Sequence, residues 1–391
     1  MRAETTGERM LRSSQLAVAG VFSLNGFTFA SWVVRIPTVQ EKLALSEGPL
    51  GIVLLGGVAG SVMSMPFAGW LVSRLGSRPV VATSAFLTSL ALPLLALSPS
   101  LPLLVLAFVF LGITVGALNV SMNAQAVAVE KGYGRPIMSS FHAAFSFGGL
   151  AGAASGGLVA SLGVGIVPHL LGVAVLTAVA TLPAYRALLP ASTDVAGEGP
   201  AFARPTRTLA GLGAIAFCVL LGEGAMADWS AVYLSGPLGT GPGFAAAGYT
   251  AFSLTMATGR LIGDRLVQRL GAVTLVRSGG ALAALGLGLS LTVGQPAVAL
   301  AGFACAGAGF SIVFPVALSA AGRAKGAAPG PAIAAVSTAG YSGFLVGPPA
   351  IGFLAEAVGL GGALYVVVLL SATIALLSRT VEAATRGKSK E

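Results

Sequence analysis

The chain consists largely of long apolar runs separated by short polar breaks. A helix that crosses a lipid bilayer needs about 20 mostly apolar residues, and each run is near that length. Charged residues make up only 9% of the 391, too few to cover the surface of a soluble fold. The sequence therefore predicts an all-α membrane protein. Its twelve expected transmembrane helices lie at about residues 15–37, 48–72, 79–97, 101–129, 138–161, 166–189, 209–233, 244–266, 273–292, 296–320, 330–354 and 359–380.

The basic residues test this count of helices. With the N-terminus in the cytoplasm, 20 of the 22 Lys and Arg residues fall in cytoplasmic segments, and only Arg35 and Lys42 fall in an outer loop. A miscounted helix would reverse every later loop and remove this bias. We therefore expect twelve helices with both termini cytoplasmic, in a bacterial inner membrane. The first run is too long for the core of a signal peptide, so we expect it to be retained.

Several other classes of protein are disfavoured. The net charge of +9 suggests nucleic acid, but the basic residues stand singly or in pairs between apolar runs instead of along one stripe. The sequence holds no phosphate-binding loop of an ATP-driven pump, no HExxH motif and no cluster of metal ligands. We expect no cofactor, no metal and no enzymatic activity.

The two halves of the chain are related by an internal repeat. A shift of 195 residues aligns VSRLG at 72–76 with VQRLG at 267–271, and a shift of 197 aligns Trp32 with Trp229. The 195-residue shift also aligns Pro136 with Pro331, Gly148 with Gly343 and Gly152 with Gly347. The common spacing predicts two pseudo-symmetric six-helix bundles, the plan of transporters in which two bundles rock about a central site.

The polar stretch 190–208 separates these halves. It reads PASTDVAGEGPAFARPTRT and is rich in Pro, Gly and polar residues, as linkers are. We expect an N-terminal bundle at 1–189, a cytoplasmic linker at 190–208 and a C-terminal bundle at 209–391.

The loop GWLVSRLGSR at 69–78 resembles the signature between the second and third helices of the major facilitator superfamily (MFS). That resemblance covers essentially the whole chain and implies the MFS fold. It also implies gating roles for Arg74 and Arg78. Ser73 stands where the family usually has an aspartate, and Arg260 and Asp264, at i and i+4, are candidates for a substitute gating pair.

Four further stretches resemble the fucose-permease-like branch, and most closely its YbjJ-like bacterial members. These are RIP at 35–37, MNAQ at 122–125, SFH at 140–142 and GEGAMADW at 222–229. Sugar-transporting members are proton symporters with one acid in helix 1 and another in helix 4. Those positions are Val33 and Asn119 here, so the mechanism does not carry over residue by residue.

Two carboxylates in the seventh expected helix are the main candidates for proton coupling. Ionisable residues inside a membrane are costly and mark functional sites. Glu223 lies near the middle of the helix and Asp228 nearer its outer end, about 140° apart around the axis. Burial disfavours a charged carboxylate, which suits it to carrying a proton. His142, which resembles a substrate-contacting position of the sugar transporters, is a third candidate. A structural role is the alternative for each.

Arg35 ends the first expected helix, whose repeat partner contains Glu223 and Asp228. An ion pair of Arg35 with either carboxylate would form an outer gate. The alternative is that Arg35 extends to the lipid headgroups.

Amide and aromatic side chains form the expected substrate site. Asn119 and Asn123 share one face of a helix, with Asn25 as a companion, and amides bind hydroxyl-bearing solutes without charge. The aromatic candidates are Trp32, Phe145, Trp229 and Tyr341, although packing or anchoring at the membrane interface also explains such residues.

Three functions fit these features. The first is proton-coupled transport of a sugar or other small polar metabolite by a monomer in the lipid bilayer. The second is proton-driven export of drugs or other amphipathic compounds. The third is a membrane sensor that kept the fold without transporting.

Overall fold

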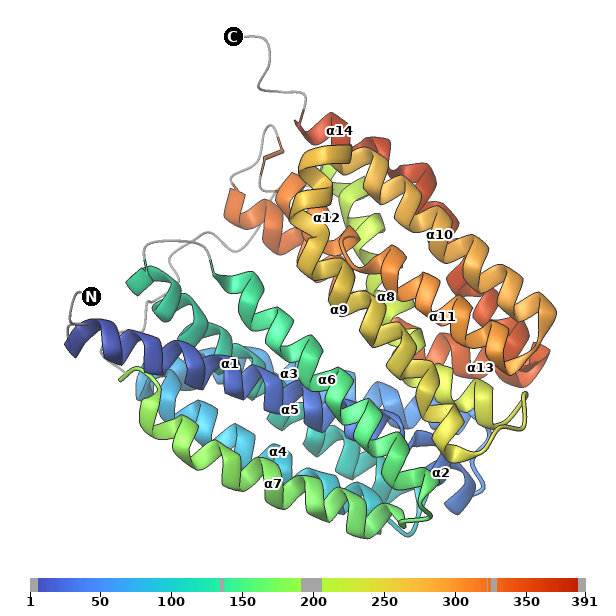
Figure 1. Ribbon diagram of the computed structural model, residues 1–391, viewed down its shortest axis with the longest axis horizontal. Coiled ribbons are helices and arrows are strands. Elements are labelled where there is room, and N and C mark those ends of the chain that lie inside the picture. Colours follow the sequence, from blue (N-terminus) through green and yellow to red (C-terminus); the bar gives the residue numbers. More distant parts are fainter. Residues whose placement is uncertain (1–5, 134–136, 191–205, 322, 325–328, 386–391) are drawn as a thin grey trace. The chain divides into compact units, whose positions relative to one another are not determined.

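The computed structural model describes residues 6–133, 137–190, 206–321, 323–324 and 329–385, and the regular structure in these ranges is α-helical (Figure 1). Contacts divide the chain into two compact units. Unit 1 comprises Met1–Ala44 and Val53–Gly197, and unit 2 comprises Leu45–Ile52 and Glu198–Glu391. The expected linker at 190–208 falls mostly outside the described residues.

The helices follow the expected runs closely. The first half of the chain contains α1 (Thr6–Val33), α2 (Ile36–Lys42), α3 (Glu47–Leu75), α4 (Ser77–Leu97), α5 (Leu101–Tyr133), α6 (Met138–Ser161) and α7 (Ile166–Ala187). The second half contains α8 (Arg207–Ser235), α9 (Pro242–Leu270), α10 (Ala272–Val293), α11 (Pro296–Phe310), α12 (Val313–Ala321), α13 (Pro329–Leu377) and α14 (Arg379–Thr385).

Ten segments of the described residues are long and apolar enough to cross a membrane. Helix α9 is not among them, because its apolar residues are interspersed with Gly, Thr and Ser and its second half carries charges. Helix α13 counts once, although Gly359 interrupts it with a backbone φ of 76°. When α9 is added and α13 is counted as two helices, the structure contains the twelve expected transmembrane helices. The tenth expected helix differs in detail, since the run at 296–320 is divided into α11 and α12.

The repeat in the sequence has a structural counterpart. Gly76 between α3 and α4 has φ 83°, and its repeat partner Gly271 between α9 and α10 has φ 80°. Both conformations favour glycine because it has no Cβ. Each glycine therefore provides the sharp connection at the same place in its half.

Close helix crossings also repeat. In unit 1, a Cβ on Gly148 of α6 would overlap the carbonyl oxygen of Ser23 on α1. In unit 2, a Cβ on Gly343 of α13 would lie 2.5 Å from the carbonyl oxygen of Phe217 on α8. Small residues let membrane helices approach this closely, and dispersion contacts then hold them together.

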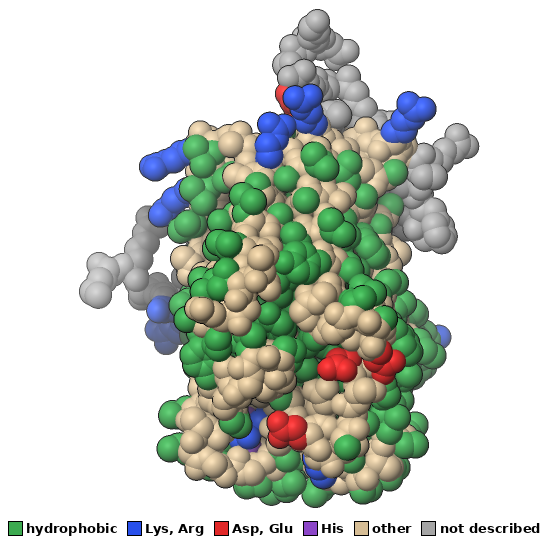
Figure 2. Space-filling model, turned by 90° about the vertical axis from the view of Figure 1, so that its right-hand side faces the viewer, with side chains coloured by type: hydrophobic (Ala, Val, Ile, Leu, Met, Phe, Trp, Pro, Cys, Tyr) green, Lys and Arg blue, Asp and Glu red, His purple; other side chains and the backbone are tan. Residues whose placement is uncertain are grey.

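The outward faces of the helices are apolar, as a bilayer requires. On α7, for example, the side chains of Val175, Val179 and Leu182 are all more than half exposed. Hydrophobic side chains also predominate over charged ones on the face that Figure 2 shows.

Candidate functional site

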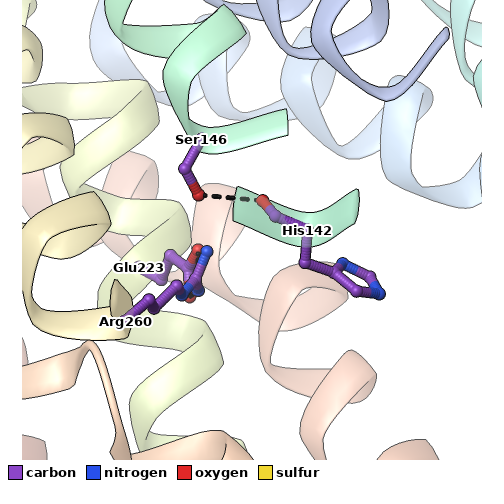
Figure 3. A network of polar contacts seen from close by, with 4 residues as sticks. All are labelled: His142, Ser146, Glu223 and Arg260. Atoms are coloured by element: carbon purple, nitrogen blue, oxygen red, sulfur yellow. Dashed lines mark hydrogen bonds and ion pairs between the residues drawn. The ribbon is translucent and has the colours of Figure 1, made fainter. Parts of the chain in front are cut away.

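An ion pair joins α8 and α9 inside unit 2. Nη2 of Arg260 lies 3.2 Å from Oε1 and 3.3 Å from Oε2 of Glu223 (Figure 3). The side chains of Arg260 and Glu223 are only 25% and 23% exposed. Charges this close and this shielded attract one another more strongly than they would in water. The attraction between the two charges is present only while Glu223 is ionised.

This position of Arg260 corrects the sequence analysis, which placed Arg260 in a cytoplasmic segment beside Asp264. Arg260 lies in the interior of α9, more than two turns before the helix ends at Leu270. A long arginine side chain can reach a carboxylate on the next helix. The side chain of Asp264 is outside the described part of the structure.

A tyrosine adds to the polar cluster in unit 2. Tyr249 of α9 is hydrogen-bonded to Ser253 and lies near enough to Glu223, Asp228 and Arg260 to interact with their charges. The cluster therefore contains two carboxylates, one guanidinium and one phenol, and these groups come from α8 and α9.

Asp228 differs from Glu223 in having no close cation. It is partly buried in α8, five residues beyond Glu223, and no hydrogen bond or ion pair joins it to another described residue.

Tyr341 of α13 lies near the same cluster. It is 47% exposed, interacts electrostatically with Glu223, and packs between the rings of Phe314 and Phe344 at centroid distances of 6.4 and 6.3 Å. The structure thus brings Tyr341 of α13 and Glu223 of α8 together.

A groove of about 470 Å³ runs between α8 and α13. Its lining is mainly apolar and includes Leu209, Phe217, Cys218, Ala339 and Ser342. This volume is within the range of pockets that hold drug-sized molecules.

Arg35 of the expected outer gate has its hydrogen-bond partners within unit 1. Its Nε donates a 2.9 Å hydrogen bond to Nδ1 of His169, and its Nη2 donates a 3.0 Å bond to the carbonyl of Val164. Arg35 is 3% exposed, so it does not extend to the headgroups. His169 and the turn before α7 supply the partners that Glu223 and Asp228 were expected to supply.

The three expected asparagines do not form one cluster. Asn119 and Asn123 share a partly exposed face of α5, where Nδ2 of Asn123 donates a 2.8 Å bond to the backbone carbonyl of Asn119. Asn25 is 4% exposed and lines a small cavity inside unit 1 that neither of the other two lines. Asn25 thus contacts a different space from the partly exposed face that carries Asn119 and Asn123.

The two repeat-related tryptophans are packing residues in this conformation. Trp32 is 3% exposed and packs edge-on against Phe108 at a centroid distance of 5.0 Å, and Trp229 is fully buried. Phe145 is partly buried and packs against the apolar core of unit 1. The burial of Trp32, Trp229 and Phe145 in this conformation therefore does not support their expected role in a substrate site.

His142 lies in the first turns of α6 and is exposed. Its ring packs edge-on against Phe22 at a centroid distance of 5.3 Å. Its carbonyl accepts a 3.2 Å hydrogen bond from Ser146, and the imidazole points away from Ser146 (Figure 3). The imidazole is thus accessible to a solute or a proton.

The expected gating arginines of the 69–78 loop differ from each other. Arg74 is exposed at the end of α3. Arg78 lies 4.6 Å above the ring of Tyr185, and it donates hydrogen bonds to the carbonyls of Tyr185 and Arg186 near the C-terminus of α7. A cation at this helix end is favoured by the helix dipole.

Three structural residues were not singled out from the sequence. Gln125 is fully buried, and it bonds to Ser77 and to both backbone groups of Leu189. Lys42 donates hydrogen bonds to the carbonyls of Ala96 and Ser98, and these bonds explain why this lysine is tolerated in an outer loop. In unit 2, Glu356 accepts hydrogen bonds from Ser46 and Gly48 at the start of α3. A sequence pattern does not reveal such partners, which are distant along the chain.

Among the described residues, no group of three or more His, Cys, Asp or Glu side chains is placed to hold a metal ion.

Comparison with known proteins agrees with this architecture. The family model described as Major Facilitator Superfamily matches residues 16–328. An uncharacterized MFS-type transporter of Yersinia pestis is 36% identical over 371 residues, covering 94% of this chain and 96% of that protein. An uncharacterized transporter of Sinorhizobium fredii is 36% identical over 373 residues, which cover 95% of this chain and 98% of that protein.

Solved structures with the same fold include three transporters. A bacterial homologue of the human lysosomal transporter Spinster, inward-facing, has a TM-score of 0.73 at 14% identity over 98% of this chain and 99% of that one. The nucleoside transporter NupG has a TM-score of 0.69 at 15% identity and covers 95% of this chain and 99% of its own. The Escherichia coli fucose:proton symporter FucP has a TM-score of 0.62 at 17% identity and covers 94% of this chain and 98% of its own.

The family match, the full-length relatives and the helical architecture together determine the class of protein. The chain belongs to the Major Facilitator Superfamily and is a multi-pass membrane transporter of small molecules, not an enzyme.

Proposed function

We propose that this transporter couples the movement of a small polar solute to the proton gradient, with Glu223 as the proton-carrying group. The observation that carries the proposal is the ion pair of Glu223 with Arg260, formed between helices of one bundle and largely shielded from solvent. Charged residues inside membrane helices typically mark ion or proton pathways.

The coupling follows from competition for one carboxylate. A proton that binds Glu223 neutralises it and removes the attraction that holds Arg260. The guanidinium of Arg260 is then held less firmly by α8 and can interact with a solute. When the proton leaves, the ion pair re-forms and Arg260 is withdrawn. Asp228 and Tyr249 are further groups of unit 2 to which a proton can pass, and His142 is an exposed titratable group of unit 1.

The solute is proposed to be polar and hydroxyl-bearing. Asn119 and Asn123 present amides on a partly exposed face of α5, and amides pair with hydroxyl groups without adding charge. Two structural neighbours are named a fucose:proton symporter and a nucleoside transporter. The protein is proposed to act as a monomer in a bacterial inner membrane with both termini cytoplasmic, in keeping with the distribution of Lys and Arg.

Flux into proteoliposomes tests this proposal. An inward proton gradient is imposed, and uptake of radiolabelled fucose and uridine is measured for the wild type, Glu223→Gln and the control Glu41→Gln. Glu41 is an exposed carboxylate on α2. We expect proton-driven accumulation of at least one solute by the wild type and by Glu41→Gln, and an at least tenfold loss in Glu223→Gln. Unchanged accumulation in Glu223→Gln would remove that residue from the mechanism.

If neither solute is carried, a thermal-shift screen of the purified protein against a solute library identifies the class. A ligand that binds only the folded state raises Tm, so stabilisation by one chemical class names the substrate.

A second candidate function is the export of amphipathic compounds, favoured by the apolar groove between α8 and α13. Ala339→Trp would fill this groove, whereas Ala357→Trp adds the same side chain at an exposed position elsewhere on α13. Export predicts that ethidium efflux is lost only in Ala339→Trp. Sugar or nucleoside transport without any ethidium efflux by the wild type would exclude this candidate.

A further inference from the structure

A small polar cavity lies in the interior of unit 1, where α1, α4, α5 and α7 meet. Its volume is about 10 Å³. The polar side chains that line it are Asn25, Thr28, Thr88, Ser89, Thr177 and Thr181. Six polar side chains around one small space are unusual in a membrane bundle, because no bulk water is available there to satisfy them.

Two of these side chains have unused hydrogen-bonding capacity. Asn25 is 4% exposed, and among the described residues its one hydrogen bond is to Sδ of Met122, at 3.9 Å, a weak acceptor. Thr28, one turn further along α1, is 5% exposed, and its hydroxyl bonds to no described residue. A buried polar group without a partner costs roughly 1–3 kcal/mol, so the bundle needs a partner for both.

The opposite wall of the cavity presents acceptors. The Thr88 hydroxyl donates a 2.8 Å bond to the carbonyl of Ser84, and the Thr181 hydroxyl donates a 2.7 Å bond to the carbonyl of Thr177. Each hydroxyl hydrogen is therefore already used in a hydrogen bond, and the lone pairs of each hydroxyl oxygen remain available to accept another. A guest that bonds to the hydroxyl of Thr88 or Thr181 must donate a hydrogen, and a guest that bonds to the Asn25 amide nitrogen must accept one. The Thr28 hydroxyl can do either.

We propose that this cavity binds one water molecule, which joins α1 to α4 and α7. Water both donates and accepts, and a cavity of this size holds about one molecule. An alkali cation would fit the volume and the oxygen atoms, but no carboxylate lines the cavity to balance its charge, and a buried unbalanced charge is very costly. Asn25 is therefore a ligand of an internal water and not of the transported solute.

The repeat shows that this site belongs to one half of the chain. At the shift of 197 residues, Asn25 and Thr28 correspond to Gly222 and Ala225 in α8, which carry no polar side chain. The water site is thus specific to unit 1.

A high-resolution structure of the purified protein in lipid nanodiscs tests the proposal directly. We expect one isolated density peak about 2.7–3.2 Å from the Asn25 amide and from a threonine oxygen of the opposite wall. An empty cavity, in a map that shows other buried waters, would overturn the proposal. So would a peak that disappears when sodium is replaced by choline, because it would identify a cation.

Thermal unfolding provides a second measurement. Asn25→Leu and Thr28→Val keep the side-chain size and remove the groups that bind the water, and we expect each to lower Tm by about 2–4 °C. The control is Thr114→Val in α5, because Thr114 is 2% exposed, donates to the carbonyl of Leu111 and does not line the cavity. Equal or higher Tm values for Asn25→Leu and Thr28→Val than for the control would indicate a dry cavity and contradict the proposal.

Discussion

The guanidinium of Arg260 lies 3.2 Å from the carboxylate of Glu223, and both side chains are about three-quarters buried. This relationship links α8 to α9 and places a fixed positive charge beside the carboxylate that we propose carries the proton. The protonation state of Glu223 thereby controls how firmly Arg260 is held.

The pair should make a measurable contribution to stability. In a double-mutant cycle of Glu223→Gln, Arg260→Gln and the double variant, we expect a coupling energy of about 1–3 kcal/mol. Each single variant removes one charge of the Arg260–Glu223 pair, whereas the double variant removes both. Unfolding in detergent measures the cycle, and effects that add to within about 0.5 kcal/mol would show that the two residues do not interact.

Arg35 and His169 should behave as a structural pair. Arg35→Met removes two hydrogen bonds and leaves the carbonyl of Val164 without its donor, so we expect the unfolding free energy to fall by about 2–4 kcal/mol. Arg35→Lys should restore little, because an ammonium cannot reproduce the geometry of the guanidinium. Arg9→Met, at an exposed position of α1, is the control. If the wild type and Arg35→Met melt at the same temperature, the pair has no structural role.

The crossing of α1 and α6 depends more on Gly148 than on the neighbouring Gly149. A methyl group at Gly148 would overlap the carbonyl of Ser23, whereas one at Gly149 would lie 3.7 Å from the carbonyl of Gly26. We expect Gly148→Ala to lower the stability by about 1–3 kcal/mol and Gly149→Ala to be tolerated. Yield of monodisperse protein and Tm measure both, and equal behaviour of the two variants would contradict the described packing.

The orientation of the chain can be tested with reporter fusions. A fluorescent protein fused after Glu391 should fluoresce, and alkaline phosphatase at the same position should be inactive, because the positive-inside bias places that end in the cytoplasm. Active phosphatase at that position would reverse the proposed orientation.

The sequence was sufficient for features that follow from local patterns. Apolar run length predicted the twelve helices, and the alignment of VSRLG with VQRLG predicted two related halves, in which Gly76 and Gly271 have matching conformations. Glu223 was found because a charge within an apolar run is rare. These signals lie within one helix or at a fixed shift, so they are readable without coordinates.

Partners across the bundle were not predictable in the same way. Arg35 was expected to pair with Glu223 or Asp228, but its partners are His169 and Val164. Asn25 was grouped with Asn119 by residue type, yet its helix face turns it into the interior of unit 1. Which side of a nearly all-apolar helix faces the bundle is weakly encoded, because lipid and protein interior select similar residues.

The central claim is that Glu223 carries the proton that drives transport. Proteoliposomes loaded with a pH-sensitive dye measure it directly when a transported solute is added outside. We predict proton movement together with solute movement for the wild type, and solute movement without protons for Glu223→Gln. Proton movement that persists in Glu223→Gln at the wild-type ratio to solute would contradict the claim.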